Sequence, residues 1–184
     1  MASESEIRDL VRRVVDEIAT DEAPRHGSTQ SVGIAIGADH GGFQLKEKLA
    51  AHLRDQGLTV VDCGTSGPDS VDYPDLAHAV ATQVADGRCE CGIVIDGAGI
   101  GSSITANKVP GVRAALCYDI SSARNSREHN HANVLTLGAG LIGESLARQI
   151  VDTWLQTPWG SGRHARRVEK ILEVERRYAS RTKD

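Results

Sequence analysis

The sequence predicts an α/β protein with a parallel sheet, because short apolar runs of strand type alternate with runs of helical periodicity from Val32 onward. Polar and glycine-rich turns follow the apolar runs, as expected where parallel strands end at one edge of a sheet. The expected strands cover residues 32–38, 58–64, 91–97, 112–118 and 133–138. The expected helices lie near residues 42–56, 74–86, 101–108, 119–129, 141–156 and 163–180, and the last is long and charged enough to be an exposed or partner-contacting arm.

Length and composition favour one such domain with a short appended segment, since 184 residues suit one α/β domain better than two. A formal net charge of -4 and an aromatic content of 3% argue against a nucleic-acid surface, which needs basic patches and stacking rings. No apolar run reaches the ~18 residues of a membrane span, and charges interrupt the N-terminal region, so we expect a cytoplasmic protein without nucleic-acid or membrane partners. The four cysteines lack paired metal-site spacing and are expected to be free thiols.

Residues 1–31 differ from the main domain, residues 32–184, and are interpreted as an amphipathic helix on a flexible linker. The helix is expected over residues 3–19, where the apolar side chains form one stripe. The residues that follow it are polar and include Pro24 and Gly27, which is typical of a linker. The apolar stripe consists of Ile7, Leu10, Val11, Val14, Val15 and Ile18.

The stretch "GIVIDGAGIGSSITANK", residues 92–108, contains the most informative strand end. Gly97, Gly99 and Gly101 alternate between a strand and a helix, so their amides are suited to bind a phosphate or the oxyanion of an enediolate. The spacing matches neither a Walker A loop nor the full dinucleotide motif, so it identifies no ligand by itself. Asp96 precedes these donors and is either a general base beside an oxyanion hole or a carboxylate that caps the turn.

A second candidate pair follows the first expected strand. Asp39 and His40 lie in "GADHGG", at the edge of the sheet where ligands of open parallel sheets bind. The same two residues are equally compatible with a turn followed by a helix cap. Both interpretations stay open on this evidence.

Histidines and arginines near the C-terminus form the third set of candidates. His129 and His131 lack a cysteine or carboxylate partner at metal-ligand spacing, so we expect no metal and prefer an acid–base role for His129. Arg163 and Arg167 lie at the start of the last expected helix. They are suited to bidentate phosphate binding, with a solvated basic helix face as the alternative.

The motifs "GADHGG", "DYP", "GAGIG", "ANKVPGVRAAL", "REHN", "NVL" and "GRHARRV" occur in unbroken order over about residues 32–178. Together they resemble the type B ribose-5-phosphate isomerase family, which also contains galactose-6-phosphate, allose-6-phosphate and tetrulose-phosphate isomerases. The resemblance implies a Rossmann-like three-layer sandwich with a five-stranded parallel sheet and no metal or organic cofactor. It also implies a homodimer that exchanges C-terminal helices, in some members paired into a tetramer, with active sites at the dimer interface.

The reaction that the resemblance implies is an aldose–ketose interconversion through a cis-enediolate, with ribose 5-phosphate and ribulose 5-phosphate as the expected pair. His129, with Asn130 beside it, would assist opening of the sugar ring. His40, Arg163 and Arg167 would bind the phosphate. The other implied substrate contacts are Asp39, His40, Tyr73, Gly97, Gly99, Gly101 and Ser102.

The chain departs from the family at the position of the base. One branch of the family uses a cysteine at the position of Asp96, assisted by a threonine at Ala98, and the other uses a glutamate at Ser102. Asp96 is therefore the one carboxylate of this loop and our candidate base. Gly140 stands where many members have a phosphate-binding arginine, so a tetrose or hexose phosphate stays open as substrate. A sugar-phosphate-binding protein without catalysis also stays open.

The N-terminal segment lies outside the resemblance and is similar to the targeting peptides of bacterial microcompartments. Residues 3–19 are accordingly expected to bind a shell protein, which would bring the chain into a microcompartment within the cytoplasm. Packing of this helix on its own domain or on an oligomer partner is the alternative. A further alternative is a scaffold whose N-terminal helix binds a partner.

Overall fold

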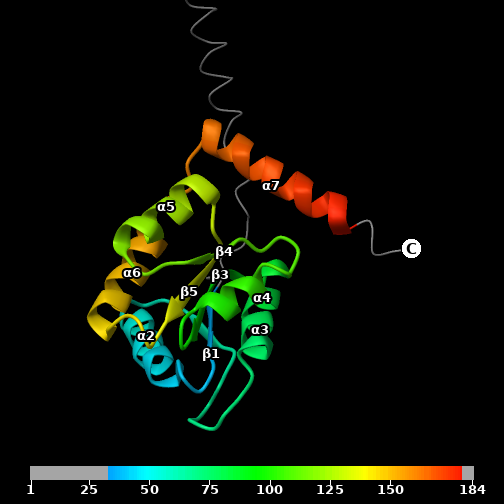
Figure 1. The fold of residues 1–184 in the computed structure, drawn as a ribbon. Coiled ribbons are helices and arrows are strands. Elements are labelled where there is room, and N and C mark those ends of the chain that lie inside the picture. The colour runs from blue at the N-terminus through cyan, green and yellow to red at the C-terminus, as the bar shows by residue number, and fades with distance from the viewer. Residues whose placement is uncertain (1–32, 180–184) are drawn as a thin grey trace, which may run out of the picture. The chain divides into compact units, whose positions relative to one another are not determined.

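The computed structural model describes residues 33–179, which form a parallel α/β fold (Figure 1). The sheet has the strand order β2-β1-β3-β5-β4, and each neighbouring pair is parallel. Its strands are β1 (Gly33–Ala38), β2 (Val60–Asp62), β3 (Cys89–Asp96), β4 (Ala114–Leu116) and β5 (Val134–Gly138). The predicted fold class is confirmed, although β2 and β4 are shorter than expected because each lies at an edge and pairs on one side.

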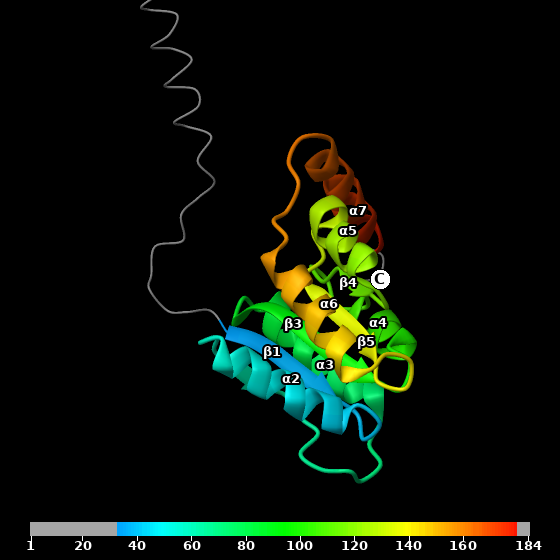
Figure 2. The same ribbon diagram turned by 90° about the vertical axis from the view of Figure 1, so that its left-hand side faces the viewer.

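Helices cover both faces of the sheet (Figure 2). The core beneath α2, α5 and α6 is separate from the core beneath α3 and α4. The helices are α2 (Phe43–Asp55), α3 (Tyr73–Ala85), α4 (Ile100–Ala106), α5 (Ile120–Asn130), α6 (Glu144–Gln156) and α7 (Arg163–Ala179). The expected N-terminal helix and linker, residues 1–31, lie outside the described residues.

The central strand β3 is buried on both faces, as a near-continuous apolar run in a parallel sheet predicts. Ile93 and Ile95 pack into the core beneath α2, α5 and α6. Val94 points to the opposite side and packs beneath α3 and α4. Because β3 is held between two layers, the residue at its end, Asp96, has a fixed position.

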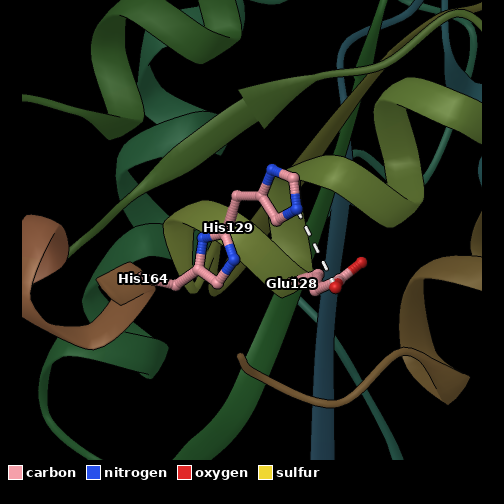
Figure 3. Close-up of side chains that lie close together, drawn as sticks. All are labelled: Glu128, His129 and His164. Atoms are coloured by element: carbon pink, nitrogen blue, oxygen red, sulfur yellow. Dashed lines mark ion pairs between the residues drawn. The ribbon is translucent and has the colours of Figure 1, made fainter. Parts of the chain in front are cut away.

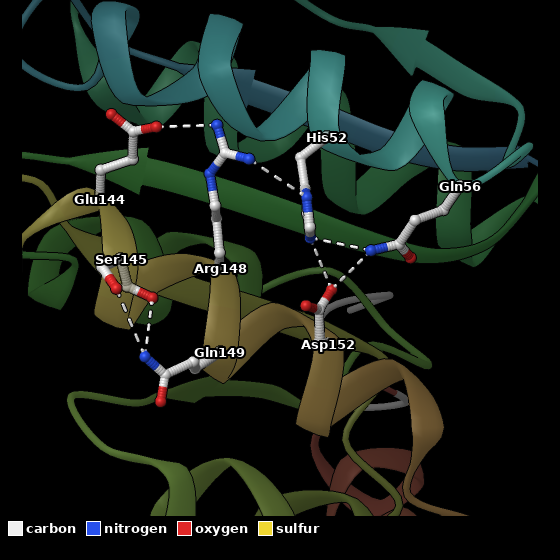
Figure 4. A network of polar contacts seen from close by, with 7 residues as sticks. All are labelled: His52, Gln56, Glu144, Ser145, Arg148, Gln149 and Asp152. Carbon is white, nitrogen blue, oxygen red and sulfur yellow. Dashed lines mark hydrogen bonds and ion pairs between the residues drawn. The ribbon is translucent and has the colours of Figure 1, made fainter.

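Polar contacts join α2 to α6 on one face of the sheet (Figure 4). His52 Nε2 lies 2.8 Å from Asp152 Oδ1, and His52 Nδ1 lies 3.4 Å from the guanidinium of Arg148. Within α6, Arg148 donates to Glu144 Oε1 at 2.8 Å. Glu144 also pairs with Lys48 of α2 at 2.7 Å. These contacts fix the two helices that cover β1, β3 and β5 from this side.

The topology separates the two ends of α5. Asp96 pairs with Gly138, the last residue of β5, whereas Asn130 at the end of α5 precedes Val134, the first residue of β5. The four-residue step from Val134 to Gly138 is about 13 Å long in an extended strand. Residues at the C-terminal end of α5 therefore lie near the amino ends of the strands, whereas Asp96 lies at their carboxyl ends.

The last helix, α7, packs against α5 and buries one residue, Val168. Its apolar side chains Ile171, Val174 and Tyr178 form a stripe and are exposed by 45%, 53% and 60%. The sequence expectation of an exposed C-terminal arm agrees with this arrangement. Between residues 33 and 179, no helix is both long enough and apolar enough to span a membrane.

Candidate active site

Asp96 is 5% exposed, and its carboxylate accepts four hydrogen bonds from the turn that follows β3. Oδ1 accepts from the amide of Ala98 at 2.7 Å and from the amide of Gly99. Oδ2 accepts from the Ser102 amide at 3.0 Å and from the Ser102 hydroxyl. These donors offset the burial of the negative charge, so the carboxylate organises the turn as the capping interpretation predicts.

The glycines of the turn have different roles. Gly99 has a left-handed backbone with φ of 77°, and a Cβ there would lie 2.8 Å from the carbonyl carbon of Leu137. Its amide donates to Asp96 and is therefore not available to a ligand in this arrangement. Gly97 is exposed, and within residues 33–179 its amide has no hydrogen-bond acceptor.

Two neighbouring loops hold the backbone of this turn. The Gly140 amide donates to the Gly97 carbonyl at 2.9 Å, and the Tyr118 hydroxyl donates to the Ala98 carbonyl at 2.8 Å. Sequence reasoning did not select Tyr118. Its position directly after the fourth expected strand is the signal that would have found it.

Three further predicted residues meet the turn at the same edge of the sheet. Asp39 is 9% exposed and accepts from the Gly42 amide at 2.9 Å, and a Cβ on Gly41 would contact both Asp39 Oδ1 and the Gly97 amide nitrogen. His40 Nδ1 lies 3.4 Å from a backbone amide of the loop before α3. A Cβ on Gly101 would lie 2.5 Å from the Tyr73 ring, so this ring packs closely against the glycine. We call Asp39, His40, Tyr73 and residues 96–102 the sheet-end cluster.

A second group of predicted residues lies where α5 meets α7 (Figure 3). The His129 and His164 rings stack with centroids 4.2 Å apart and an angle of 9° between their planes. His129 Nδ1 lies 2.9 Å from the Asn125 amide nitrogen, and His129 Nε2 lies 3.8 Å from Glu128 Oε1. Burial, followed by the charges of His129 and Arg163, lowers the pKa of His164.

The phosphate-binding candidates belong to the same group. Arg163 and Arg167 are exposed in the first two turns of α7. Asn130 lines a cavity of about 930 Å³ between α7 and β4, together with Arg113 and Ile171. We call His129, Asn130, Arg163 and Arg167 the α5–α7 cluster. This cluster lies near the amino ends of the strands, whereas the sheet-end cluster lies at their carboxyl ends.

His131 and Arg127 do not join either cluster. His131 Nε2 lies 2.7 Å from the Gly160 carbonyl, and its ring stacks on Trp159. Arg127 donates to the Ala132 carbonyl at 2.7 Å and lies over the Trp154 ring. Both side chains therefore contribute to packing at the end of α5.

The cysteines are not suited to act as bases. Burial is the main cause that raises the pKa of Cys63 to about 11 and the pKa of Cys91 to about 12. Burial also raises the pKa of Cys89 and Cys117. These thiols are protonated at neutral pH, so the carboxylates and histidines are the groups available for proton transfer.

A buried lysine that sequence reasoning did not select supports the loop after β2. Lys46 is 1% exposed, and its Nζ donates to Asp62 Oδ2 at 2.7 Å and to the Thr65 carbonyl at 2.8 Å. A buried lysine of this kind is retained where its charge is paired. It positions the loop that reaches His40.

The parallel sheet, the glycine turn and the buried carboxylates at the carboxyl ends of the strands define a Rossmann-like α/β protein of the small-ligand-binding class. The profile of the Ribose/Galactose Isomerase family matches residues 34–171. The chain is 47% identical to ribose-5-phosphate isomerase B of Escherichia coli K12 over 144 residues, which are 78% of this chain and 97% of that protein. It is 43% identical over 142 residues to D-erythrulose-4-phosphate isomerase of Pectobacterium atrosepticum, covering 76% of this chain and 93% of that protein.

A solved structure agrees with these sequence comparisons. Ribose-5-phosphate isomerase B of Clostridium thermocellum is 54% identical and superimposes with a TM-score of 0.78, covering 79% of this chain and 99% of that chain. The chain belongs to the Ribose/Galactose Isomerase family. The expectation of a sugar isomerase is thereby confirmed.

Proposed function

We propose that this chain interconverts ribose 5-phosphate and ribulose 5-phosphate in the cytoplasm through a cis-enediolate. The observation that carries the proposal is the buried carboxylate of Asp96 beside the exposed Gly97 amide at the carboxyl end of β3. A base next to a free hydrogen-bond donor is what an enediolate reaction requires. The high identity to ribose-5-phosphate isomerase B, over nearly its whole length, supports the choice of substrate.

Asp96 is our candidate base, and one of its oxygens must be freed to accept a proton. Three of its four donors are backbone amides with fixed positions, whereas the Ser102 hydroxyl can rotate away from Oδ2. Oδ2 then takes the proton from C2 of the open-chain aldose and returns it to C1. The proton of the C2 hydroxyl passes to the C1 oxygen at the enediolate stage, which completes the conversion of the aldose to the ketose. The carboxylate is regenerated, so no oxidant or reductant is consumed.

The remaining residues of the sheet-end cluster hold the substrate. The Gly97 amide and the first-turn amide of Gly101 bind the enediolate oxygens, while the Gly99 amide holds the base. Asp39 and Tyr73 contact the sugar, and His40 contacts its phosphate end. The oxyanion donors are fixed by the fold before the reaction, which is what makes such donors effective.

The α5–α7 cluster completes the site from a second copy of the chain. Within one chain, His129 and Arg167 lie near the amino ends of the strands and Asp96 lies at their carboxyl ends. This separation is too large for one sugar phosphate to contact Asp96 together with His129 and Arg167. The exposed apolar stripe of α7 is suited to pack on another copy. A homodimer, alone or paired into a tetramer, then joins His129 and Asn130 for ring opening, and Arg163 and Arg167 for phosphate binding, with the partner's Asp96.

The substrate is tested by turnover of pentose, tetrose and hexose phosphates, with exchange of the C2 proton in deuterated water as the readout. We expect ribose 5-phosphate to turn over faster than the phosphates of erythrulose and of hexoses. Asp96→Asn should lower turnover by roughly 10²–10⁴-fold, the usual contribution of a general base, while ribose 5-phosphate still raises the Tm of the variant. Binding of ribose 5-phosphate by the native chain without proton exchange would contradict the proposal.

The shared site is tested by combining two inactive variants. Asp96→Asn and His129→Asn are co-expressed with different tags, and the mixed dimer is purified through both tags. If each site takes one cluster from each copy, the purified mixed dimer keeps about half of the native activity, since one of its two sites is intact. If the mixture is as inactive as either variant alone, both clusters act within one chain and the shared site is refuted.

Residues 3–19 are proposed to bind a shell protein of a bacterial microcompartment, on the evidence of their amphipathic pattern and the linker behind them. Deletion of residues 1–30 should leave the oligomer and the isomerase activity unchanged and abolish co-localisation with the shell. Loss of the oligomer in the deletion variant would instead support packing of this segment on the enzyme.

A further inference from the structure

Three side chains at the junction of α5 and α7 bring metal-binding atoms together (Figure 3). Glu128 and His129 lie in the last turn of α5, and His164 lies in the first turn of α7. One carboxylate oxygen and one nitrogen from each imidazole all lie within 4.8 Å of one another. Imidazole nitrogens and a carboxylate form a donor set that Zn²⁺ and similar ions prefer.

The His129 ring is already oriented for this role. Its Nδ1 contacts the Asn125 side-chain amide at 2.9 Å, which leaves Nε2 facing Glu128 at 3.8 Å. Metal-bound histidines usually donate their second ring N–H to a neighbouring acceptor. The Asn125 amide can present its oxygen to that N–H, because the two ends of an amide are interchangeable by a flip.

His164 has a polar atom that the protein leaves unsatisfied. Its Nδ1 is buried and has no hydrogen-bond partner among the described residues, whereas its Nε2 lies 3.4 Å from Arg163 Nε, which can donate to it. A buried polar atom without a partner is rare in folded proteins and calls for an explanation. A coordinated ion is one, because rotation of the ring exposes a nitrogen lone pair to the ion.

From these observations we infer that Glu128, His129 and His164 bind one Zn²⁺-class divalent cation. Tetrahedral coordination at bond lengths of about 2.0–2.2 Å sets the donor atoms about 3.4 Å apart, so the present 4.8 Å spread must shrink by little more than 1 Å. The two rings are parallel, and one must turn about its Cβ–Cγ bond to direct a lone pair at the ion. Water takes the fourth position.

The surroundings give the ion a route and limit its affinity. Glu128 lines a cleft of about 640 Å³ with Arg124 and Trp159, which provides access from solvent. The C-terminal end of α5 carries the negative end of its helix dipole and favours a cation. The guanidinium groups of Arg163 and Arg167 oppose it, so we expect reversible binding rather than a permanently held structural ion.

The ion is expected to inhibit the enzyme. This consequence rests on the proposed function, in which His129 assists ring opening, because an ion on Nε2 occupies the lone pair that accepts a proton. The site itself does not depend on that proposal, since binding is measured without turnover. An experiment can therefore contradict the metal site without contradicting the proposed isomerase function, and the reverse also holds.

Binding is tested on the full chain after treatment with a chelator, by titration with Co²⁺ and by competition of Zn²⁺ with a chromophoric chelator. We expect one ion per chain and the visible absorption of tetrahedral Co²⁺. Glu128→Gln and His164→Asn should each weaken binding by about tenfold or more, and Asn125→Ala should do so through the orientation of His129. His78→Gln changes an exposed histidine on α3 and is the matched control, expected to bind as the native chain does.

Folding of each variant is checked by its Tm in the absence of metal. Loss of binding in the cluster variants, with native Tm and with native binding by His78→Gln, supports the site. Equal binding by the native chain, Glu128→Gln and His164→Asn would refute it, as would the absence of any binding. In the activity assay, Zn²⁺ should inhibit the native chain at a lower concentration than is needed to inhibit the Glu128→Gln variant. Without metal, the turnover of this variant should equal that of the native chain.

Discussion

At the scale of single residues, the carboxylate of Asp96 has a double part in the proposed site. Its four hydrogen bonds hold the turn from Ala98 to Ser102, and its buried position brings it to the same edge of the sheet as Asp39. The turn leaves the Gly97 amide free while it uses the Gly99 amide internally. Neighbouring glycines with the same chemistry should therefore respond differently to substitution.

Gly97→Ala and Gly99→Ala separate these two roles. A Cβ at Gly97 meets no atom within 4 Å, so the variant should keep its Tm and raise KM several-fold as the methyl group enters the substrate space. Gly99→Ala should lower the free energy of unfolding by about 1–3 kcal/mol, because its φ of 77° disfavours a side chain and the Cβ would press on Leu137. Thermal denaturation and steady-state kinetics distinguish the two. An unstable Gly97→Ala variant would contradict the assignment of open space.

At the scale of elements, α5 runs from the carboxyl ends of the strands to their amino ends. Its N-terminal end is capped by Asp119, which accepts from the Ser122 amide at 2.8 Å. Its C-terminal end carries Glu128 and His129 and is fixed by Arg127 against Trp154. The helix thus holds His129, the candidate catalytic histidine, at a fixed distance from the carboxyl ends of the strands, where the helix begins.

The cap predicts a pH-dependent contribution to stability. The Ser122 amide is the main cause that lowers the pKa of Asp119 in the folded chain. A carboxyl group with a lowered folded pKa stabilises the protein above its unfolded pKa, and this contribution is lost as the pH falls through the folded value. Asp119→Ala should therefore lower the Tm at pH 7, and the difference from the native chain should shrink in acid.

Asp69→Ala, in the exposed loop before α3, is the control and should leave the Tm unchanged over the same pH range. Melting curves followed by circular dichroism measure both variants. A Tm difference for Asp119→Ala that grows in acid would contradict the capping role.

At the scale of the whole molecule, the chain has an apolar face on α7 that its own core does not use. Ile171, Val174 and Tyr178 are exposed, whereas Val168 alone among the described residues of this helix is buried. In addition, the sheet-end cluster lies at the carboxyl ends of the strands and the α5–α7 cluster lies near their amino ends. The second copy proposed above, packed on α7, would account for both features.

Val174→Asp places a charge in the middle of this stripe. We expect the variant to shift from dimer to monomer in sedimentation velocity and to lose isomerase activity, while its far-UV circular dichroism stays native. Lys170→Asp introduces the same side chain at an exposed position of α7 and should remain dimeric. If Val174→Asp remained a fully active dimer, the α7 stripe would not be the interface.

Much of the fold was predictable because its signals are local. The apolar runs of β1, β3 and β5 are continuous since these strands are buried on both faces, and their positions agree with prediction. The edge strands β2 and β4 were predicted too long, because pairing on one side ends them early. Asp39, His40 and Tyr73 were found as candidates because they lie just after strands or in a family motif.

The sequence alone determined the order of strands and helices, the family and the candidate residues, because periodicity, glycine turns and motifs are written along the chain. Tertiary structure decided which candidates meet. It gave Asp96 four donors, stacked His164 on His129 although their residue numbers differ by 35, and divided the candidates between the carboxyl ends and the amino ends of the strands. Contacts between remote elements follow from how helices cross the sheet, and no local pattern encodes them.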